Sequence, residues 1–252
     1  MTDKIALITG GSRGLGRSGA LHLASQGVGI VLTYLSNATD AEAAVSEIES
    51  KGVKAVALQL DVSDSTQFDA FVARFSEALD QKWQRKSFDF LVNNAGIGAH
   101  SPFAETTEEA FDSMINIHVK GVFFLTQKLL PLIEDGGKIL NVSTGLTRFS
   151  IAGYAAYAAA KGAVEVLTRY QALELGARGI SVNVLAPGAI ETDFGGGAVR
   201  DNKELNQYLA SNTAMGRVGL PEDIGGAITS LLTGDNQWMT AQRIEASGGY
   251  SL

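Results

Sequence analysis

The chain has 252 residues, of which 45% are hydrophobic and 19% are charged, and its formal net charge is −7. This length and composition fit one large globular domain with a substantial buried core. The negative charge argues against binding to nucleic acid or to acidic membranes, which requires a basic face. The sequence contains no cysteine, which excludes disulfides, thiolate zinc sites and cysteine nucleophiles.

The N-terminal sequence predicts neither a membrane helix nor a signal peptide. Its short apolar run within MTDKIALITGG stops at glycines before it reaches the length that crosses a bilayer, and no cleavage-site pattern follows. We therefore expect a cytoplasmic protein with no membrane partner and no nucleic-acid partner.

Short apolar runs rich in β-branched residues alternate with longer segments of helical pattern. The predicted strands are residues 4–9, 29–34, 54–60, 88–93, 138–142, 180–186 and 242–246. Their continuous valine, isoleucine and leucine indicate strands that are buried on both faces, as in parallel sheets. The sequence predicts a single α/β domain, with a doubly wound, Rossmann-type parallel sheet of about seven strands flanked by helices.

Helical patterns fill the intervals between these strands. The predicted helices are residues 14–26, a segment from about residue 39, residues 64–79, a long region from about residue 106 to residue 130, residues 153–178, residues 203–211 and a segment after Pro221. Two of the starts match capping boxes, in which a threonine hydroxyl satisfies a free backbone amide: Thr39-x-x-Glu42 and Thr106-x-x-Glu109. Residues 194–215 open with Phe194 and three glycines, which predicts a hinged substrate flap within the domain.

A glycine-rich turn, Thr9-Gly-Gly-Ser-Arg-Gly-Leu-Gly16, separates the first predicted strand from the first predicted helix. Glycines here allow a tight turn and let backbone amides approach a diphosphate at the positive end of the helix. The spacing departs from the usual dinucleotide fingerprint, but the position at the start of the sheet predicts a nucleotide site. The residues that we assign to the cofactor in this turn are Gly10, Ser12, Arg13, Gly14, Leu15 and Gly16.

The end of the second predicted strand distinguishes NADP from NAD. An acidic residue there would bind the ribose 2′-hydroxyl of NAD, yet the sequence after Tyr34 has no carboxylate until Asp40. Arg13 offers a 2′-phosphate a charge-assisted fork. Neutral donors are available from Ser12, Ser36 and Asn37. The sequence therefore predicts NADP(H) as the preferred cofactor, with NAD(H) as the alternative, and adds Tyr34 and Ser36 to the cofactor site.

Tyr157 and Lys161 lie four residues apart in a run of strong helix formers, so their side chains share a helix face. Hydroxyl groups stand upstream at Ser143 and Thr144, at the end of the fifth predicted strand. Together these residues offer a proton donor, a charge that tunes it and a second hydrogen-bonding group. Alone, the pair occurs by chance in many proteins.

Further motifs follow one another along the chain: the glycine turn, Asn93-Asn94-Ala95-Gly96, Asn116, Tyr157-x-x-x-Lys161 and Pro187-Gly188. In this order and at these spacings they resemble the single-domain short-chain dehydrogenases/reductases, from the first strand to Gly248-Gly249. The resemblance implies an oxidoreductase that transfers hydride between NADP(H) and a carbonyl or secondary alcohol. It also implies a homo-oligomer, a tetramer or a dimer.

The resemblance also implies roles for individual residues. Tyr157 matches the proton donor, and Lys161 matches the residue that binds the nicotinamide ribose and lowers the tyrosine pKa. Asn116 matches a helix asparagine that holds a water linked to that lysine. Asp61 and Val62 match the adenine contact. The other positions that match cofactor contacts are Asn94, Ala95, Gly96, Pro187, Gly188, Ile190 and Thr192.

One position departs from the family pattern, because the register of the family serine falls on Thr144 and Ser143 lies one residue earlier. A threonine hydroxyl makes the same hydrogen bond to a substrate oxygen. We favour Thr144 and keep Ser143, presented by a bulge, as the alternative.

The chemistry explains why these residue types are needed. Hydride addition puts negative charge on a carbonyl oxygen, which needs a proton, and an ordinary tyrosine has a pKa near 10. Poising it near 7 takes roughly 4 kcal/mol of preferential phenolate stabilisation. An ammonium group such as that of Lys161 supplies about one to three of the three pKa units required. The residue at 143 or 144 would stabilise charge on the substrate oxygen.

The remaining candidates concern the substrate and metals. Apolar residues near the predicted cleft favour a hydrophobic or aromatic ketone or an acyl chain: Ile97, Phe103, Phe149, Tyr154 and Phe194. The histidines, His22, His100 and His118, are scattered and predict no metal site. His118 follows Asn116 by two, so we expect it to point elsewhere. A 3-oxoacyl-carrier-protein reductase is the alternative enzyme, and a non-catalytic NADP(H)-binding sensor or scaffold is the alternative of another class.

Overall fold

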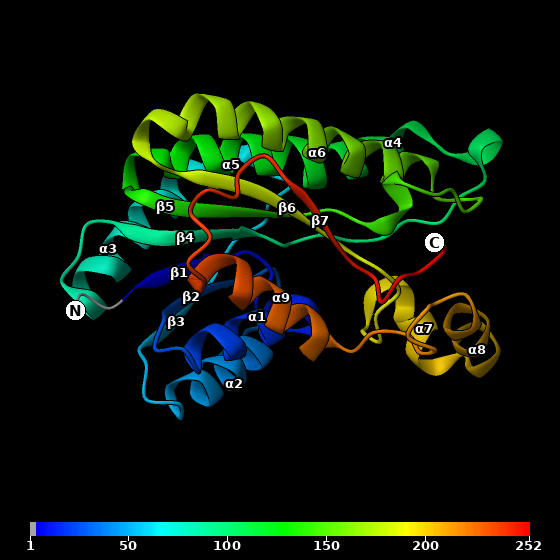
Figure 1. Cartoon of the computed structure of the whole chain (residues 1–252). Coiled ribbons are helices and arrows are strands. Elements are labelled where there is room, and N and C mark those ends of the chain that lie inside the picture. Colours follow the sequence, from blue (N-terminus) through cyan, green and yellow to red (C-terminus); the bar gives the residue numbers. More distant parts are fainter. Residues whose placement is uncertain (1–3) are drawn as a thin grey trace.

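A computed structural model describes residues 4–252, and these residues form a sheet of seven parallel strands. The strands are β1 (Ile5–Ile8), β2 (Gly29–Tyr34), β3 (Ala55–Gln59), β4 (Phe88–Asn93), β5 (Ile133–Val142), β6 (Ser181–Pro187) and β7 (Arg243–Ala246). Their order is β3-β2-β1-β4-β5-β6-β7, so the chain winds outward from β1 in both directions (Figure 1). The predicted doubly wound parallel sheet is confirmed.

Helices cover both faces of the sheet (Figure 1). One face carries α1 (Gly14–Ala24), α2 (Ala38–Glu49) and α9 (Pro221–Thr233). The other carries α3 (Phe68–Trp83), α4 (Glu108–Ile115), α5 (Val122–Leu129) and α6 (Ala155–Leu175). Two short helices, α7 (Ala198–Asp201) and α8 (Lys203–Ser211), stand beyond the carboxyl ends of the strands, near the C-terminus.

Two apolar cores form because successive side chains of a strand point to opposite faces. In β1, Ala6 and Ile8 pack with residues of α1, α2 and α9, whereas Ile5 and Leu7 pack with residues of α3, α5 and α6. Every residue of β1, β4 and β6 is buried. Burial on both faces accounts for the continuous apolar runs in the sequence.

Two helix starts differ from the predicted capping boxes. At α2 the side chain of Asn37, not Thr39, accepts a hydrogen bond from a first-turn amide (3.2 Å). At α4 the side chain of Thr107, not Thr106, does so (3.2 Å). Neighbouring polar side chains compete for the same free amides. The sequence therefore locates each helix start but not the residue that caps it.

The long helical region predicted before Pro131 is interrupted. α4 ends at Ile115, a π-helical turn spans Asn116–Gly121, and α5 follows. A Cβ on Gly121 would lie 2.4 Å from the Val62 carbonyl oxygen, so glycine lets this turn touch the segment after β3. Turns of this type occur often at functional sites.

The predicted flap, residues 194–215, contains α7 and α8. Its three successive glycines, Gly195, Gly196 and Gly197, have φ angles of 61°, 74° and 78°, which side chains disfavour. That this segment moves stays a prediction. Among the helices formed by residues 4–252, none combines the length and apolar character that a bilayer-spanning helix needs.

Candidate active site

The candidate site lies where the parallel strands end (Figure 1). The glycine turn follows β1, residues 94–96 follow β4, Ser143 and Thr144 follow β5, and residues 187–188 close β6. α6 supplies Tyr157 and Lys161. Because all the strands are parallel, these segments meet at one edge of the sheet, where ligands bind in doubly wound folds.

Hydrogen bonds hold the glycine turn against the segment after β4. Asn94 Nδ2 donates to the carbonyl oxygens of Thr9 (2.9 Å) and Gly10 (3.2 Å). A Cβ on Gly16 would lie 2.4 Å from the Gly10 carbonyl oxygen, and a Cβ on Gly10 would lie 2.9 Å from Ala95 Cα. Only glycine fits these two positions, and the two segments form one rigid unit.

The start of α1 fits the diphosphate of a dinucleotide. Its first turn has no acidic residue, and no side chain caps its free amides, so the positive end of the helix dipole is available to an anion. Arg13 precedes the helix and is exposed, and within residues 4–252 its guanidinium forms no hydrogen bond or ion pair.

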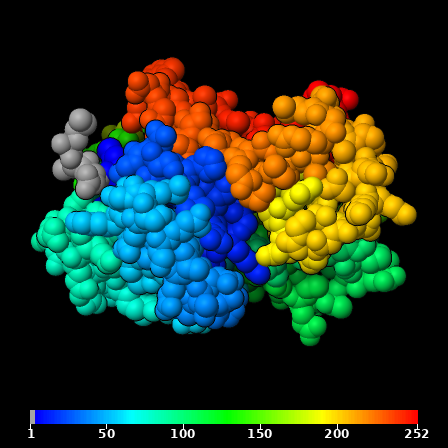
Figure 2. All heavy atoms as spheres, turned by 90° about the horizontal axis from the view of Figure 1, so that it is seen from below, coloured from blue at the N-terminus to red at the C-terminus, as the bar shows by residue number. Residues whose placement is uncertain are grey.

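The segment after β6 lies on the other side of the glycine turn. The Thr192 methyl carbon lies 3.7 Å from the place that a Cβ on Gly14 would take. In Figure 2 the yellow atoms of the segment after β6 lie beside dark blue atoms of the N-terminal part of the described chain. Gly188 donates its amide to the Ala246 carbonyl oxygen (3.1 Å), and Ile190 bridges to Gly219. The two predicted halves of the cofactor site therefore face each other.

At the adenosine end, the free groups differ partly from those expected. Asn37 is engaged with Asp40, because it caps α2 and its Nδ2 donates to Asp40 Oδ2 (2.7 Å). Asp61 Oδ1 accepts from the Ser63 amide (2.8 Å) and hydroxyl (2.6 Å), which leaves Oδ2 for a ligand. Ser36 is exposed beside the end of β2. One Asn37 amide hydrogen is therefore taken by Asp40, and the second stays available to a ligand.

Lys161 is buried beneath the end of β5. Its side chain donates from Nζ to the Val142 carbonyl oxygen (2.8 Å), and the residue is 5% exposed. Burial lowers the pKa of Lys161 to about 7. A backbone carbonyl therefore holds the lysine in place. Because its pKa is lowered, the amine readily loses its proton when no cofactor is bound.

Tyr157 is also buried, and three groups surround its ring. Lys161 Nζ lies 5.9 Å from the ring centroid, and the rings of His118 and Phe194 lie 5.3 and 5.7 Å away. Burial raises the pKa of Tyr157, whereas its hydrogen bond with the Thr144 side chain acts in the opposite direction. The expected lowering of the tyrosine pKa is not found in the protein alone, where the pKa of Tyr157 is raised, chiefly by burial.

Thr144 and Ser143 point to different partners. The Thr144 side chain lies close enough to Tyr157 to lower the pKa of the phenol by hydrogen bonding, and its hydroxyl accepts from the Leu146 amide (3.3 Å). Ser143, which is 3% exposed, donates its hydroxyl to Glu165 Oε1 (2.8 Å). Of the two residues left open by the sequence, the structure therefore brings Thr144 to Tyr157.

The expectation that His118 points away from the cleft is wrong. Its ring packs edge-on against Tyr157, with an interplanar angle of 81°. Asn116 and His118 both lie in the π-helical turn, so a spacing rule for an ordinary α-helix does not fix where their side chains point. Within residues 4–252 the Asn116 side chain forms no hydrogen bond, and its assigned role stays a prediction.

The hydrogen bonding of His118 defines its tautomer. Nε2 lies 2.8 Å from the Ile97 carbonyl oxygen, which only accepts, so Nε2 carries the hydrogen. Nδ1 is buried, and no described group hydrogen-bonds to it. Burial, followed by the charge of Lys161, lowers the pKa of His118 to about 3. The site therefore contains a neutral imidazole whose acceptor nitrogen is buried near Tyr157.

The aromatic residues expected near the cleft divide into two groups. Phe194 lies against Tyr157, and a Cβ on Gly98 would touch its ring at 2.6 Å. Tyr154 packs edge-on with His100 at 5.1 Å. Phe149 instead packs on Tyr250 and on residues of α8.

The other predicted pocket residues are more open, since Ile97 and Phe103 are 44% and 86% exposed. No group of three or more potential metal ligands gathers in the part of the chain that the structure describes.

Comparison with known proteins agrees with this architecture. The sequence profile of a family described as enoyl-(acyl carrier protein) reductase matches residues 10–251. A 3-oxoacyl-[acyl-carrier-protein] reductase of Staphylococcus aureus is 37% identical over 98% of this chain and 97% of its own. A hydroxynaphthalene reductase-like protein of Metarhizium brunneum is 34% identical over 99% of this chain and 95% of its own.

A solved structure has the same fold as this chain. The angucycline C-6 ketoreductase LanV with bound NADP superposes with a TM-score of 0.93 and 33% identity, over 98% of this chain and 95% of the other. The chain belongs to the short-chain dehydrogenase/reductase family, and its fold is that of an NADP-binding oxidoreductase.

We predict that His118 stays neutral, with its hydrogen on Nε2, from about pH 5 to 8. The reason is its burial, which holds the pKa near 3. Long-range ¹H–¹⁵N spectra of the histidine rings measure this, and the signals that disappear in His118→Asn identify the residue. A titration midpoint above pH 5 would contradict the prediction.

Proposed function

We propose that the protein is an NADP(H)-dependent ketoreductase that reduces cyclic or aromatic ketones, with Tyr157 as the proton donor. The observation that carries the proposal is the buried Tyr157, which meets Thr144, Lys161 and the ring of Phe194 at the carboxyl edge of the sheet. The glycine turn opposite this tyrosine fits the cofactor diphosphate.

Tyr157 is a phenol at neutral pH and so carries the proton to be donated, but burial raises its pKa. Donation therefore requires positive charge, such as that of Lys161 and of the oxidised nicotinamide, to stabilise the phenolate. When bound, NADPH supplies the hydride that adds to the carbonyl carbon. The developing alkoxide then takes the phenolic proton, and the product is a secondary alcohol. The reverse reaction needs a phenolate, so it requires a higher pH.

Thr144 is suited to hold the substrate oxygen. Its hydroxyl oxygen accepts from the Leu146 amide. A carbonyl oxygen only accepts, so Thr144 would turn its hydrogen from Tyr157 to the substrate oxygen. A hydrogen bond to the carbonyl oxygen would polarise it and stabilise the charge that develops there. Lys161, held by Val142, would bind the nicotinamide ribose and supply positive charge beside the tyrosine.

The aromatic cover supports the proposed substrate class. Phe194 lies over Tyr157 from the flap, and Tyr154 lies at the start of α6, so a planar ring could stack beside the reacting carbonyl. The relatives named for hydroxynaphthalene and angucycline reduction support the same class.

Two other functions lead to different experimental results. A 3-oxoacyl-carrier-protein reductase is favoured by the Staphylococcus aureus relative, but an acidic carrier needs a basic docking face and this chain has a net charge of −7. A non-catalytic NADP(H) sensor would bind the cofactor without turnover.

We also propose a cytoplasmic homo-oligomer. Large apolar side chains remain exposed on α5 and α6, where Phe123, Tyr170 and Leu173 are 44%, 61% and 79% exposed. Apolar surface of this kind marks a protein contact.

Tyr157→Phe is expected to lower the kcat for ketone reduction by about 10²–10⁴-fold, because the proton donor is removed. NADPH oxidation is measured with 1-tetralone, an aliphatic ketone and a 3-oxoacyl thioester, and NADPH binding is measured by fluorescence. The wild type should prefer the aromatic ketone and the variant should keep its NADPH affinity. Turnover retained by Tyr157→Phe would refute the donor role, and tight binding without wild-type turnover would favour the sensor.

Arg13→Met is expected to weaken NADPH binding by about 10- to 100-fold and to leave NADH binding unchanged, because a charge-assisted bond to the 2′-phosphate is lost. Arg17→Met is the matched control, since Arg17 lies one turn later and is paired with Glu47 (2.6 Å). The two dissociation constants are compared by fluorescence titration. If Arg13→Met weakens NADPH and NADH binding equally, or if Arg17→Met weakens NADPH binding as much as Arg13→Met does, Arg13 does not bind the 2′-phosphate.

A further inference from the structure

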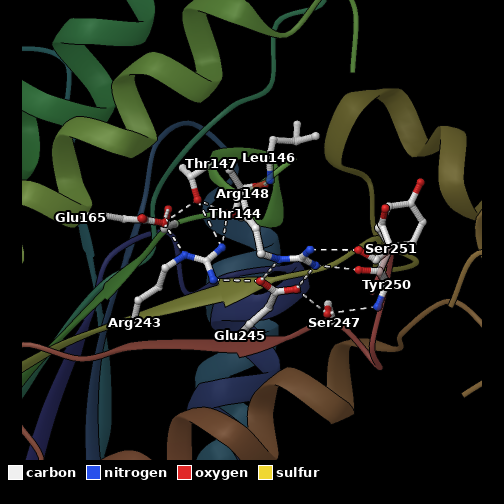
Figure 3. Close-up of polar contacts among 11 residues, drawn as sticks. Thr144, Leu146, Thr147, Arg148, Glu165, Arg243, Glu245, Ser247, Tyr250 and Ser251 are labelled. Atoms are coloured by element: carbon white, nitrogen blue, oxygen red, sulfur yellow. Dashed lines mark hydrogen bonds and ion pairs between the residues drawn. The ribbon is translucent and has the colours of Figure 1, made fainter. Parts of the chain in front are cut away.

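The loop between β5 and α6, residues 143–149, carries Thr144 and is held by one carboxylate oxygen (Figure 3). Glu165 Oε1 accepts from Ser143 Oγ (2.8 Å) and Thr147 Oγ1 (2.7 Å), one on each side of Thr144. Arg243 Nε on β7 donates to the same oxygen (2.9 Å), and Arg243 Nη2 donates to the Thr144 carbonyl oxygen (3.3 Å). The position of Thr144 is therefore fixed from two sides.

Arg148 lies in the same loop and forms a second ion pair (Figure 3). Its Nε and Nη2 donate to the two carboxylate oxygens of Glu245 at 2.9 and 2.7 Å, the fork geometry that favours arginine. Glu245 also accepts from Arg243 Nη1 (2.8 Å). The hydrogen bond from Arg148 is the largest cause that lowers the pKa of Glu245 to about 2. The four charged side chains thus form one continuous network.

Arg148 also binds the C-terminal segment, residues 247–252. Its Nη1 donates to the Ser251 carbonyl oxygen (2.9 Å), and its Nη2 donates to the Tyr250 carbonyl oxygen (2.6 Å). The adjacent Phe149 ring lies 4.9 Å from the Tyr250 ring. The loop of Thr144 and the end of the chain are therefore joined by one guanidinium group.

The C-terminal segment in turn holds the base of the flap. The amides of Ala214 and Met215, the last residues of the flap, donate to the carbonyl oxygens of Gly249 (3.2 Å) and Gly248 (3.1 Å). The Ser251 amide donates to the Asn212 carbonyl oxygen (2.9 Å). A chain of contacts thus runs from Thr144 through Arg148 to the flap, whose first residue, Phe194, lies against Tyr157.

We propose that Arg148 is a positioning residue that holds the Thr144 loop and the base of the flap in a fixed position relative to each other. It touches neither substrate nor cofactor, but it joins the residue that holds the substrate oxygen to the segment that covers the substrate. This inference rests on the proposed reductase function for its kinetic consequences. Its structural consequence, an ordered flap, requires no substrate.

The proposal separates effects on substrate from effects on cofactor. Arg148 contacts β7, its own loop and the C-terminal segment, whereas the glycine turn is held by Asn94 and Thr9. Loss of Arg148 should therefore raise the KM for the ketone and lower kcat without a change in NADPH affinity. It should also expose the flap to protease, because Arg200 and Lys203 are exposed tryptic sites within it.

Arg148→Met is the test variant, and Arg178→Met is the matched control. Arg178 also pairs with one carboxylate, that of Asp135 (2.7 Å), and donates to two backbone carbonyl oxygens, those of Leu130 and Ile133. Its side chain is 36% exposed, against 37% for Arg148. It lies after α6, at the opposite end of that helix from Tyr157, so it reports the general effect of losing such a residue.

We expect Arg148→Met to raise the KM for the ketone and to speed tryptic cleavage after Arg200 or Lys203 by about tenfold each, whereas Arg178→Met changes neither. Mass spectrometry of the fragments identifies the cut. Arg148→Lys keeps the positive charge but loses the two-pronged bond to Glu245, so its KM and its rate of flap cleavage should lie between those of Arg148→Met and Arg178→Met. If trypsin cuts Arg148→Met throughout the chain, Arg148→Lys serves as the test variant instead.

The proposal is overturned if flap cleavage and the KM of the Arg148 variants match those of Arg178→Met. An inactive wild type would refute the reductase function instead, and the cleavage comparison alone would then decide whether Arg148 orders the flap.

Discussion

The hydrogen bond from Lys161 Nζ to the Val142 carbonyl oxygen is the contact on which the site depends. It joins α6 to the last residue of β5, and the next residues of the chain are Ser143 and Thr144. The register between helix and strand therefore decides which hydroxyl meets Tyr157. Because the lysine is buried, this bond also gives its Nζ a hydrogen-bond partner. A buried polar group without such a partner would lower the stability of the fold.

Burial has a common effect on the ionisable groups around this contact. It favours the uncharged forms of Tyr157, Lys161 and His118 together, so the protein alone presents a phenol, a readily formed amine and an imidazole. A separate network of four charged side chains, Arg148, Glu165, Arg243 and Glu245, lies beside these buried groups. The residues proposed for the chemistry are thus buried, whereas the residues that hold the Thr144 loop form a charged network at the edge of the sheet.

Sequence patterns predicted the sheet and the nucleotide turn because these depend on local signals, namely apolar strands and glycines after β1. They also identified Tyr157 and Lys161, since helix periodicity fixes a pair four residues apart. The prediction for His118 was wrong, because no local sequence pattern indicates the π-helical turn. Glu165 and Arg148 carried no signal either, since their partners lie on β7 and at the C-terminus, far away in the chain.

Thr144 is proposed to act on the substrate, and Ser143 to support the loop. Steady-state reduction of the preferred ketone by Thr144→Val and by Ser143→Ala compares the two hydroxyl groups most directly. We expect Thr144→Val to lower kcat/KM by about 10²–10³-fold, as for loss of a donor to a developing oxyanion. Ser143→Ala, which loses one hydrogen bond to Glu165, should cost about tenfold at most. A loss of kcat/KM in Ser143→Ala that equals or exceeds the loss in Thr144→Val would show that Thr144 is not the hydroxyl that acts on the substrate.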